Sequence, residues 1–297
     1  MKILKWIGLG LVVLIGLVVV LALVLNFVGS NKMANAPEVT VRPISVPTDA
    51  DTIARGEYIV HNISGCAGCH GENLGGGEFF DGPPFGYVPA PNLTSSGAGS
   101  NYQSAEDWLR AIQHGVAADG RTIAPFMPVT AFSQMSDEDI AAVIAYLQTV
   151  PAADNDVGTR KLSFPGPIIF GVLGYSDMPV STVDHDSVGG TAPTPGKTAE
   201  YGKYLTTIAV CADCHGPDLT GAVDPNGPQG PNLTPGGSLG AWTEEDFLTL
   251  LQTGVKPSGT AVSDEMPWEF YSGMNDDELG AIWLYLQSLP AQETAVN

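Results

Sequence analysis

The sequence has few basic residues, with 12 lysines and arginines against 32 aspartates and glutamates in 297 residues. The net charge of −20 argues against a nucleic-acid partner, because recognition of phosphates depends on lysine and arginine. Beyond Lys197 the only basic residues are Lys203 and Lys256, so the acidity is concentrated in the C-terminal half. An acidic surface of this kind suits solubility outside the cytoplasm, or docking to a basic partner protein.

Cysteine is scarce as well, and all four cysteines lie in two motifs of the form C-x-x-C-H, at 66–70 and 211–215. No cysteine is left for a separate disulfide bond. A redox-active C-x-x-C pair would be expected in a thioredoxin-like βαβ setting, which the sequence does not show. A zinc site would need a fourth ligand at a fixed spacing, and each motif offers three. Structural disulfides would leave the two histidines of the motifs without a role.

The spacing of the C-x-x-C-H motif matches the attachment of haem c. The two thiols can form thioether bonds to the haem vinyl groups, and the adjacent histidine supplies a nitrogen ligand to the iron. The sequence therefore predicts two covalently bound haem c groups. The residues predicted to hold them are Cys66, Cys69 and His70 for the first, and Cys211, Cys214 and His215 for the second.

Residues 6–28 contain no charged side chain and form one long apolar run. As a helix they would span about 34 Å, enough to cross a hydrocarbon core of about 30 Å. Lys2 and Lys5 precede the run. By the positive-inside rule, this predicts a cytoplasmic N-terminus, with the rest of the chain on the periplasmic or outer face of a bacterial cytoplasmic membrane.

A cleavable signal peptide is the alternative for this segment, since A-N-A at 34–36 resembles a cleavage site. The apolar run is much longer than the core of a typical signal peptide, which favours an uncleaved, single-pass transmembrane anchor at 1–29. Residues 30–50 have little apolar periodicity and are expected to form a flexible tether.

Aligning the two C-x-x-C-H motifs reveals an internal repeat. Further matching blocks are P-N-L-T at 91–94 and 231–234, and the ungapped stretches 127–151 and 266–290. The repeat predicts two tandem domains, at 51–152 and 199–297, joined by a connector at 153–198. The apolar stretch F-P-G-P-I-I-F-G-V-L-G in the connector could pack across the domain interface or against the membrane, and the sequence does not choose between them.

Each copy is predicted to contain three helices. The first precedes the C-x-x-C-H motif, the second lies at about 104–115 or 243–253, and the third lies at about 137–149 or 276–288. The third helix is the best marked, since Ser136 and Asn275 are good N-caps and acidic residues follow in the first turn. No strand pattern repeats, so the predicted fold class is mostly α.

A haem iron in an electron carrier usually has a second axial ligand, methionine or histidine. The repeat acts as a filter, because a true ligand should occur in both copies. His61 and His114 align with threonines, and His185 lies in the connector. These three histidines therefore fail the filter, and ordinary surface or packing roles are expected for them.

Two pairs of methionines pass the filter: Met127 with Met266, and Met135 with Met274. Met135 and Met274 directly precede the predicted N-caps, in the position of a hydrophobic staple, which gives them a sufficient structural role. Met127 and Met266 lie in irregular segments and are each followed by proline. We therefore predict Met127 and Met266 as the second axial ligands of the two irons.

Together, the C-x-x-C-H and P-N-L-T motifs, the Met-Pro pairs and the capped last helix resemble class I c-type cytochromes. The resemblance covers about 52–151 and 199–290, and it is greatest to membrane-anchored cytochrome c subunits of periplasmic alcohol and sugar dehydrogenases. It implies two tandem class I cytochrome c domains, in which the first and last helices cross at right angles and Gly56 and Gly202 permit their close approach. Those subunits commonly carry three haems, whereas this sequence has two C-x-x-C-H motifs, so the dehydrogenase partner stays open.

The resemblance also implies residues of the haem pockets. Trp108 would lie near the first haem, with Trp242 as its looser counterpart, although plain hydrophobic packing explains both tryptophans equally well. Asn92 and Asn232, within the two P-N-L-T motifs, are the other implied pocket residues.

The function that follows is electron transfer rather than enzymatic catalysis. A membrane-anchored diheme cytochrome c would carry single electrons between redox proteins of a respiratory or photosynthetic chain, or accept them as a dehydrogenase subunit. Its partners would be redox proteins with a basic docking surface, and no small-molecule substrate is expected. The alternative is a peroxidase-like diheme enzyme, which would need an iron with an open coordination position.

Overall fold

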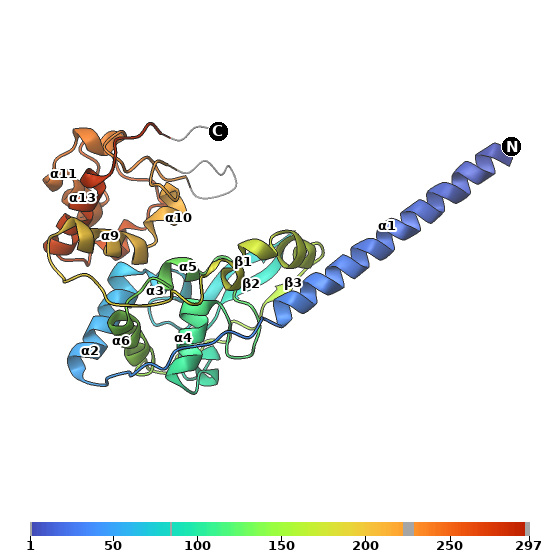
Figure 1. The fold of residues 1–297 in the computed structure, drawn as a ribbon, viewed down its shortest axis with the longest axis horizontal. Helices are drawn as coiled ribbons and strands as arrows, with labels where there is room; N and C mark the ends of the chain where they lie inside the picture. The colour runs from blue at the N-terminus through green and yellow to red at the C-terminus, as the bar shows by residue number, and fades with distance from the viewer. Residues whose placement is uncertain (1, 84, 222–228, 295–297) are drawn as a thin grey trace.

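The computed structural model describes residues 2–83, 85–221 and 229–294. One long helix, α1 (Lys2–Ala34), projects from one end of a body that contains the other described residues (Figure 1). Its apolar side chains are exposed along most of its length, and it is long and apolar enough to cross a membrane. The apolar run thus forms the helix that was predicted, and the helix continues beyond the run to Ala34.

The two repeat copies fold into matching sets of helices, so the fold is mostly α as predicted. In the first copy these are α2 (Ala50–Tyr58), the π-helical turn η1 (Ile59–Ile63), α3 (Cys66–His70), the 3-10 turn η2 (Ala98–Asn101), α4 (Ala105–His114), α5 (Val129–Phe132) and α6 (Asp137–Leu147). In the second copy they are α9 (Ala199–Ile208), α10 (Cys211–His215), the 3-10 turn η5 (Ser238–Ala241), α11 (Glu244–Thr253), α12 (Trp268–Tyr271) and α13 (Asp276–Ser288). The predicted second and third helices of both copies are confirmed as α4, α6, α11 and α13.

Local sequence explains where these helices begin. Ser136 and Asn275 cap α6 and α13 as predicted, each accepting a hydrogen bond from the backbone N–H three residues later. Ser104 and Thr243 cap α4 and α11 through reciprocal capping boxes. Acidic residues occupy the first turn of all four helices, where their negative charge interacts favourably with the positive end of the helix dipole.

The first and third helices of each copy meet at a glycine. A Cβ atom on Gly56 would lie 1.9 Å from the carbonyl oxygen of Ala142, and one on Gly202 would lie 1.8 Å from that of Ala281. Because both distances are far below van der Waals contact, no larger residue fits without separating α2 from α6, or α9 from α13. The close helix contact expected at these glycines is therefore present in both copies.

A small antiparallel sheet, which the sequence did not predict, lies beside the first copy. Its strands, in sheet order, are β1 (Gly77–Gly82), β2 (Gly86–Ala90) and β3 (Lys161–Leu162). These strands lie outside the aligned repeat blocks, and β3 belongs to the connector, so a search for repeated strands could not find them. The second-copy residues 222–228, and the last residues of the predicted domain 199–297, lie outside the described part of the chain.

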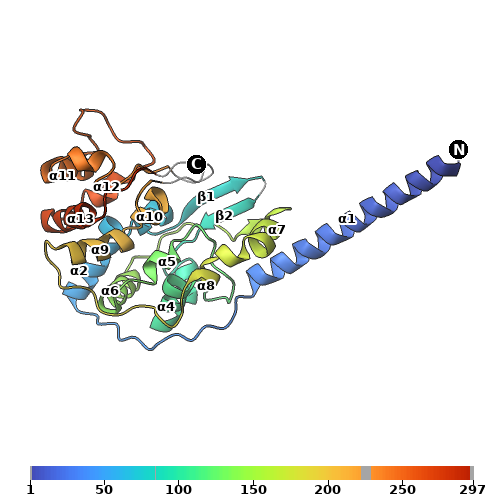
Figure 2. The ribbon, with the colours of Figure 1, turned by 45° about the horizontal axis from the view of Figure 1, so that its top comes forward.

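The connector packs against the base of α1. It forms α7 (Gly166–Ile168), the π-helical turn η3 (Ile169–Leu173), the 3-10 turn η4 (Tyr175–Asp177) and α8 (Pro179–Thr182). Both α7 and η3 contact α1, whereas the second copy lies at the end of the body away from α1 (Figure 2). The apolar stretch of the connector therefore lies beside the C-terminal end of α1 and not between the two copies.

Residues 30–50, which were expected to form a flexible tether, lie along the first copy instead. α1 continues to Ala34, and Val41, Ile44 and Val46 then pack against the hydrophobic core. Arg42 fixes the segment further, since its Nε donates to Asp137 Oδ1 at 3.0 Å. These three apolar side chains and Arg42 hold the segment against the first copy, although its composition alone predicts a linker.

The two copies meet in a pseudo-symmetric interface, in which the first helix of each copy contacts the N-terminus of the other copy's third helix. Tyr204 of α9 donates a hydrogen bond to Asp139 of α6 at 2.7 Å. Its repeat counterpart, Tyr58 of α2, donates to Glu278 of α13 and accepts from the backbone N–H of Asn275 at 3.0 Å. Equivalent residues thus make equivalent contacts in both directions.

Arg55 lies at the centre of this interface. Its Nε donates to Asp139 Oδ1 at 2.9 Å, and its Nη1 donates to Glu278 Oε1 at 3.3 Å. Both carboxylates are buried, so the guanidinium compensates charges that burial would otherwise penalise. The interface therefore joins the copies through a shared ion-pair network in addition to apolar packing.

Candidate haem sites

Each C-x-x-C-H motif forms one short helix, α3 or α10, that contains both cysteines and the histidine. Cysteines three positions apart on a helix lie on the same face, as attachment to one porphyrin edge requires. Both helices follow a residue in the left-handed region, Gly65 with φ 59° and Val210 with φ 62°. This conformation is costly for a β-branched valine, and such strain is typical of functional sites.

Burial of the leading cysteines keeps them as neutral thiols. The four cysteines are free, and burial raises the pKa of Cys66 and of Cys211 to about 12. Redox and metal-binding cysteines usually have a lowered pKa, because the thiolate is the reactive form. A raised pKa disfavours the thiolate, so the setting of these thiols argues against a C-x-x-C redox function.

The histidines of the two motifs are held in one tautomer by the P-N-L-T loops. His70 Nδ1 lies 2.8 Å from the carbonyl oxygen of Pro91, and His215 Nδ1 lies 2.7 Å from that of Pro231. A carbonyl can only accept, so Nδ1 carries the proton and Nε2 keeps a free lone pair. Within the described residues Nε2 has no hydrogen-bond partner, and burial lowers the pKa of both histidines. Both imidazoles are thus neutral and able to ligate iron.

Asn92 and Asn232 hold these loops in place. Asn92 accepts from the backbone N–H of Thr94 at 2.9 Å and donates to the carbonyl of Ala153 at 2.9 Å. Asn232 makes the same pair of bonds, to Thr234 N at 2.8 Å and to a carbonyl in the segment after α13 at 2.9 Å. Both asparagines thereby position the proline carbonyl that fixes the histidine. A direct contact of either side chain with haem stays a prediction.

The two candidate methionine ligands lie in turns of the same conformation. The backbone N–H of Met127 donates to Ala124 at 3.2 Å, and that of Met266 donates to Ser263 at 2.9 Å. In both turns the methionine carbonyl accepts from the residue two positions later, at 2.8 Å. Both side chains lie partly buried at the edge of the core. The repeat has therefore preserved the local structure around these methionines as well as their sequence.

The remaining candidates have other surroundings. Met135 and Met274 are 2% and 3% exposed within the core, which agrees with a structural role. His61 Nε2 lies 3.0 Å from the hydroxyl of Tyr146. His114 and His185 contact each other, with 2.9 Å between their Nδ1 atoms. The three histidines that fail the repeat filter therefore all have protein partners.

The two tryptophans differ in their environment. Trp108 is 4% exposed and stacks on Tyr102, with 4.3 Å between the ring centroids. Trp242 is partly exposed beside the core. Phe247, the aligned counterpart of Trp108, packs against Trp283 at 5.6 Å. These contacts show the packing role of the aromatic positions, and their place in the haem pockets stays a prediction.

The first site contacts the second copy directly, which the sequence did not reveal. A Cβ atom on Gly68, inside the first C-x-x-C-H motif, would lie 2.8 Å from the ring of Phe270 in α12. Phe270 follows Met266 by four residues, so α3 touches the segment that carries the second candidate ligand. Asp213, the counterpart of Gly68, is exposed. The single difference between the motifs thus follows from the interface between the copies.

Comparison with known proteins finds a matching family model and several relatives. A family model described as cytochrome c matches residues 53–151 and 199–290. The fructose dehydrogenase cytochrome subunit of Gluconobacter japonicus is 28% identical over 302 residues, which cover 91% of this chain and 58% of that protein. The alcohol dehydrogenase (quinone) cytochrome c subunit of Gluconacetobacter polyoxogenes is 30% identical over 278 residues, covering 82% and 57%. A diheme cytochrome c-type protein of Cereibacter sphaeroides is 28% identical over 266 residues, covering 81% and 86%. The chain thus spans less than three fifths of either dehydrogenase subunit.

Proposed function

This chain belongs to the cytochrome c family, and on that premise we propose that it is a membrane-anchored carrier of single electrons with two haem c groups. The observation that carries the proposal is the repeated site: a C-x-x-C-H helix whose histidine donates Nδ1–H to a proline carbonyl. When bound, each haem supplies an iron that changes between Fe(II) and Fe(III). The residues of the chain attach that group, orient its ligands and limit the access of water.

Each copy supplies a complete set of residues for one haem. Two cysteines would form the thioether bonds, the histidine Nε2 would ligate the iron, and the methionine sulfur would supply the second protein ligand. These sets are Cys66, Cys69, His70 and Met127 in domain 51–152, and Cys211, Cys214, His215 and Met266 in domain 199–297. A thioether ligand raises the reduction potential relative to a second histidine.

The proposed arrangement in the membrane follows from α1. Anchoring by α1, with the N-terminus in the cytoplasm, would keep both domains on the periplasmic face. Domain 51–152 would then lie nearer the membrane, because the second copy is at the far end of the body (Figures 1 and 2). Its partners would be membrane or periplasmic redox proteins. Dehydrogenases are among them, since two of the relatives are named as dehydrogenase subunits.

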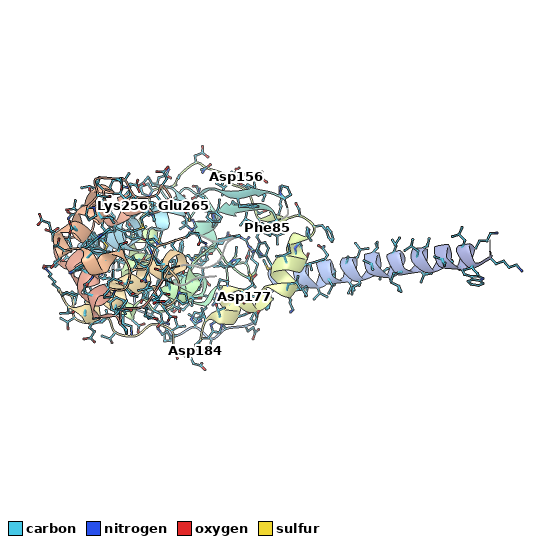
Figure 3. All side chains as sticks on the ribbon, turned by 90° about the horizontal axis from the view of Figure 1, so that it is seen from above. Phe85, Asp156, Asp177, Asp184, Lys256 and Glu265 are labelled. Carbon is cyan, nitrogen blue, oxygen red and sulfur yellow. The ribbon has the colours of Figure 1, made fainter. Side chains whose placement is uncertain are left out.

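Acidic residues beside Met266 support docking of a basic partner at the second copy. Asp264, Glu265 and Glu269 flank this methionine and are exposed. Figure 3 shows Glu265 farther from α1 than Phe85 is. The equivalent positions of the first copy, 125, 126 and 130, are uncharged. Opposite charge accelerates encounter over distances comparable to a Debye length of about 8 Å at physiological salt.

Salt dependence tests this docking surface. With a basic soluble cytochrome c as probe, we expect the rate of electron exchange to fall as ionic strength rises. Glu265→Gln should lower the rate at low salt, whereas Asp186→Gln, at an exposed connector position, should leave it unchanged. A rate that does not change with ionic strength would contradict the proposed docking.

Carbon monoxide binding tests the electron-carrier function against the peroxidase alternative. We expect the reduced wild-type protein to bind no carbon monoxide, because on each iron a methionine would occupy the coordination position that carbon monoxide needs. Met127→Leu should open one position and bind one equivalent of carbon monoxide. The matched variant Met135→Leu, a volume-conserving change at a buried methionine, should bind none. Binding of carbon monoxide or peroxide by one haem of the wild-type protein would favour the peroxidase alternative.

A further inference from the structure

The foot of α1, which we define as residues 22–34 of the helix with connector residues 164–174, exposes large apolar side chains. Phe164 is 63% exposed and Leu173 is 74% exposed. The connector lies tightly against the helix, since a Cβ atom on Gly29 would be 1.9 Å from the carbonyl oxygen of Pro167. Gly171 in turn approaches Gly29 so closely that its Cβ would lie 2.3 Å from the Gly29 carbonyl oxygen. Backbone contacts between small residues of this kind are typical of helices packed within membranes.

The position of this contact along α1 places the connector at the edge of the bilayer. The apolar run ends at Val28, and the connector contacts α1 at the next residue, Gly29. One residue of helix rises 1.5 Å, so this contact lies within about 2 Å of the end of the run. In a membrane-spanning α1 the exposed side chains of 164–174 would therefore lie at the interface, where apolar exposure carries little penalty.

An aromatic cluster continues this surface toward the first haem site. Phe85 and Phe126 both pack on Phe170 of η3, with 4.8 and 5.9 Å between ring centroids. Phe126 also packs on the 44% exposed Phe79, and it directly precedes Met127. Figure 3 shows Phe85 close to the base of α1. The apolar surface thus extends from the anchor to the turn of the first methionine ligand.

A pocket of about 410 Å³ opens beside the same end of α1. It is lined by Ser30, Met33 and Ala34 of α1, together with Asp119, Arg121, Arg160, Leu162 and Pro167. Residues 30–34 rise about 3–9 Å beyond Val28, and the headgroup layer on each side of the hydrocarbon core is about 5–8 Å thick. The pocket therefore lies at the level of the lipid phosphates.

The charge of the pocket favours an anion. Arg160 donates to the carbonyl oxygens of Thr122 and Met33, each at 3.1 Å. Within the described part of the chain no carboxylate forms an ion pair with it, and burial together with the neighbouring Arg121 lowers its pKa to about 10. Arg121 pairs with Asp119 at 2.7 Å, which leaves a net positive charge in a protein of net charge −20. A phosphate diester of a lipid has the charge and the location that this pocket requires.

We propose that the foot of α1 is a second membrane contact, in which residues 164–174 rest in the adjacent bilayer interface and the pocket between Arg121 and Arg160 takes the phosphate of an anionic phospholipid. This proposal rests on the proposed anchoring by α1. It fixes the first copy against the bilayer and brings the Met127 turn to the membrane surface, where a membrane-bound electron donor can reach it.

Site-directed spin labels test the membrane contact. The full haem-loaded chain is reconstituted in vesicles with one added cysteine, which is the only free thiol once the four motif cysteines hold haem. We expect a nitroxide at Leu173→Cys to be reached by oxygen and shielded from an aqueous nickel complex. The control label at Lys256→Cys, at the end of the body away from α1 (Figure 3), should be reached by the nickel complex.

A third label distinguishes the proposed anchoring by α1 from the proposed membrane contact of residues 164–174. Leu14→Cys lies in the middle of α1, and of the three labels it should be the least accessible to the nickel complex. If Leu14 is shielded and Leu173 is as accessible to nickel as Lys256, the helix spans the bilayer and the second contact is refuted. If Leu14 itself is accessible to nickel, the proposed anchoring fails first.

Retention of lipid tests the pocket. Wild-type protein extracted from vesicles of phosphatidylcholine and phosphatidylglycerol should retain the anionic lipid in preference to the neutral one. Arg121→Gln should lower this preference about fivefold, which corresponds to about 1 kcal/mol per basic residue at a membrane surface. Arg110→Gln is the matched control, since Arg110 also pairs with an aspartate and has nearly the same exposure, 32% against 33%. Equal retention of both lipids, or displacement of the anionic lipid by inorganic phosphate, would overturn the lipid assignment.

Discussion

Removing one hydroxyl group should weaken the contact between the two copies by a measurable amount. Tyr204 is 9% exposed, and its hydroxyl donates to Asp139 at 2.7 Å and accepts from the backbone N–H of Ser136 at 3.1 Å. A hydrogen bond to a charged group contributes about 1.5–3 kcal/mol, and a buried donor left unpaired adds to the loss. Since Arg55 still compensates Asp139 in the variant, we expect Tyr204→Phe to lower the free energy of unfolding by about 2 kcal/mol.

Chemical unfolding of the haem-loaded chain in detergent, followed by far-ultraviolet circular dichroism, measures this change. Tyr58→Phe removes the pseudo-symmetric bond to Glu278 and should have an effect of similar size. Tyr285→Phe is the control, because its hydroxyl has no hydrogen bond within the described residues, and a change within about 0.5 kcal/mol is expected. If Tyr204→Phe is as stable as Tyr285→Phe, the interface does not hold the copies together in the way argued above.

Three further predictions follow from individual contacts. Gly68→Ala should lower the free energy of unfolding by about 1–3 kcal/mol, because the added Cβ meets the ring of Phe270, and an unchanged unfolding curve would refute that contact. Gly202→Ala should cost about 3 kcal/mol, since it forces α9 away from α13, and a thermal or chemical unfolding midpoint equal to wild type would contradict the helix contact. Burial and the neighbouring His185 lower the pKa of His114 to about 4, below its unfolded value of about 6.5. Stability from this group is therefore present above pH 6.5 and lost as pH falls toward 4, and His114→Gln should flatten that decline in a pH series of unfolding curves.

The features that the sequence predicted correctly are those that local residues determine. The spacing of C-x-x-C-H, the N-caps Ser136 and Asn275, and the apolar run of α1 each specify structure within a few turns of chain. The repeat provided a second criterion, because a ligand should occur in both copies. It selected Met127 and Met266, which lie in matching turns, and it rejected the three histidines that have protein partners. These patterns predicted the mostly α fold, which the structure confirms, whereas the haem-binding roles of the site residues stay a prediction.

The features that it missed depend on contacts between distant segments. The P-N-L-T motif of the first copy holds His70 through the backbone carbonyl of Pro91. The sequence could not predict this contact, because every residue has a backbone carbonyl. Residues 30–50 have the composition of a linker, yet Val41 and Arg42 hold them to the first copy. The requirement for glycine at position 68 comes from Phe270, about two hundred residues away in the chain, and no local pattern could reveal it.

The two ends of the body have different surfaces, which suggests a direction for electron transfer. The first site continues into the aromatic cluster at the foot of α1, and the second has exposed acidic residues beside Met266. The interface around Arg55 holds the two sites at a fixed separation. We therefore expect a membrane-bound donor to reach the first copy, and a soluble basic acceptor to dock on the second.

The central claim is that each copy holds one redox-active haem c. An optical redox titration of the purified full-length chain, calibrated by its haem content per chain, tests it most directly. We expect two covalently bound haems and two electrons taken up per chain, each in a one-electron step. Uptake of one electron per chain, or haem that is released by acid extraction, would contradict the claim.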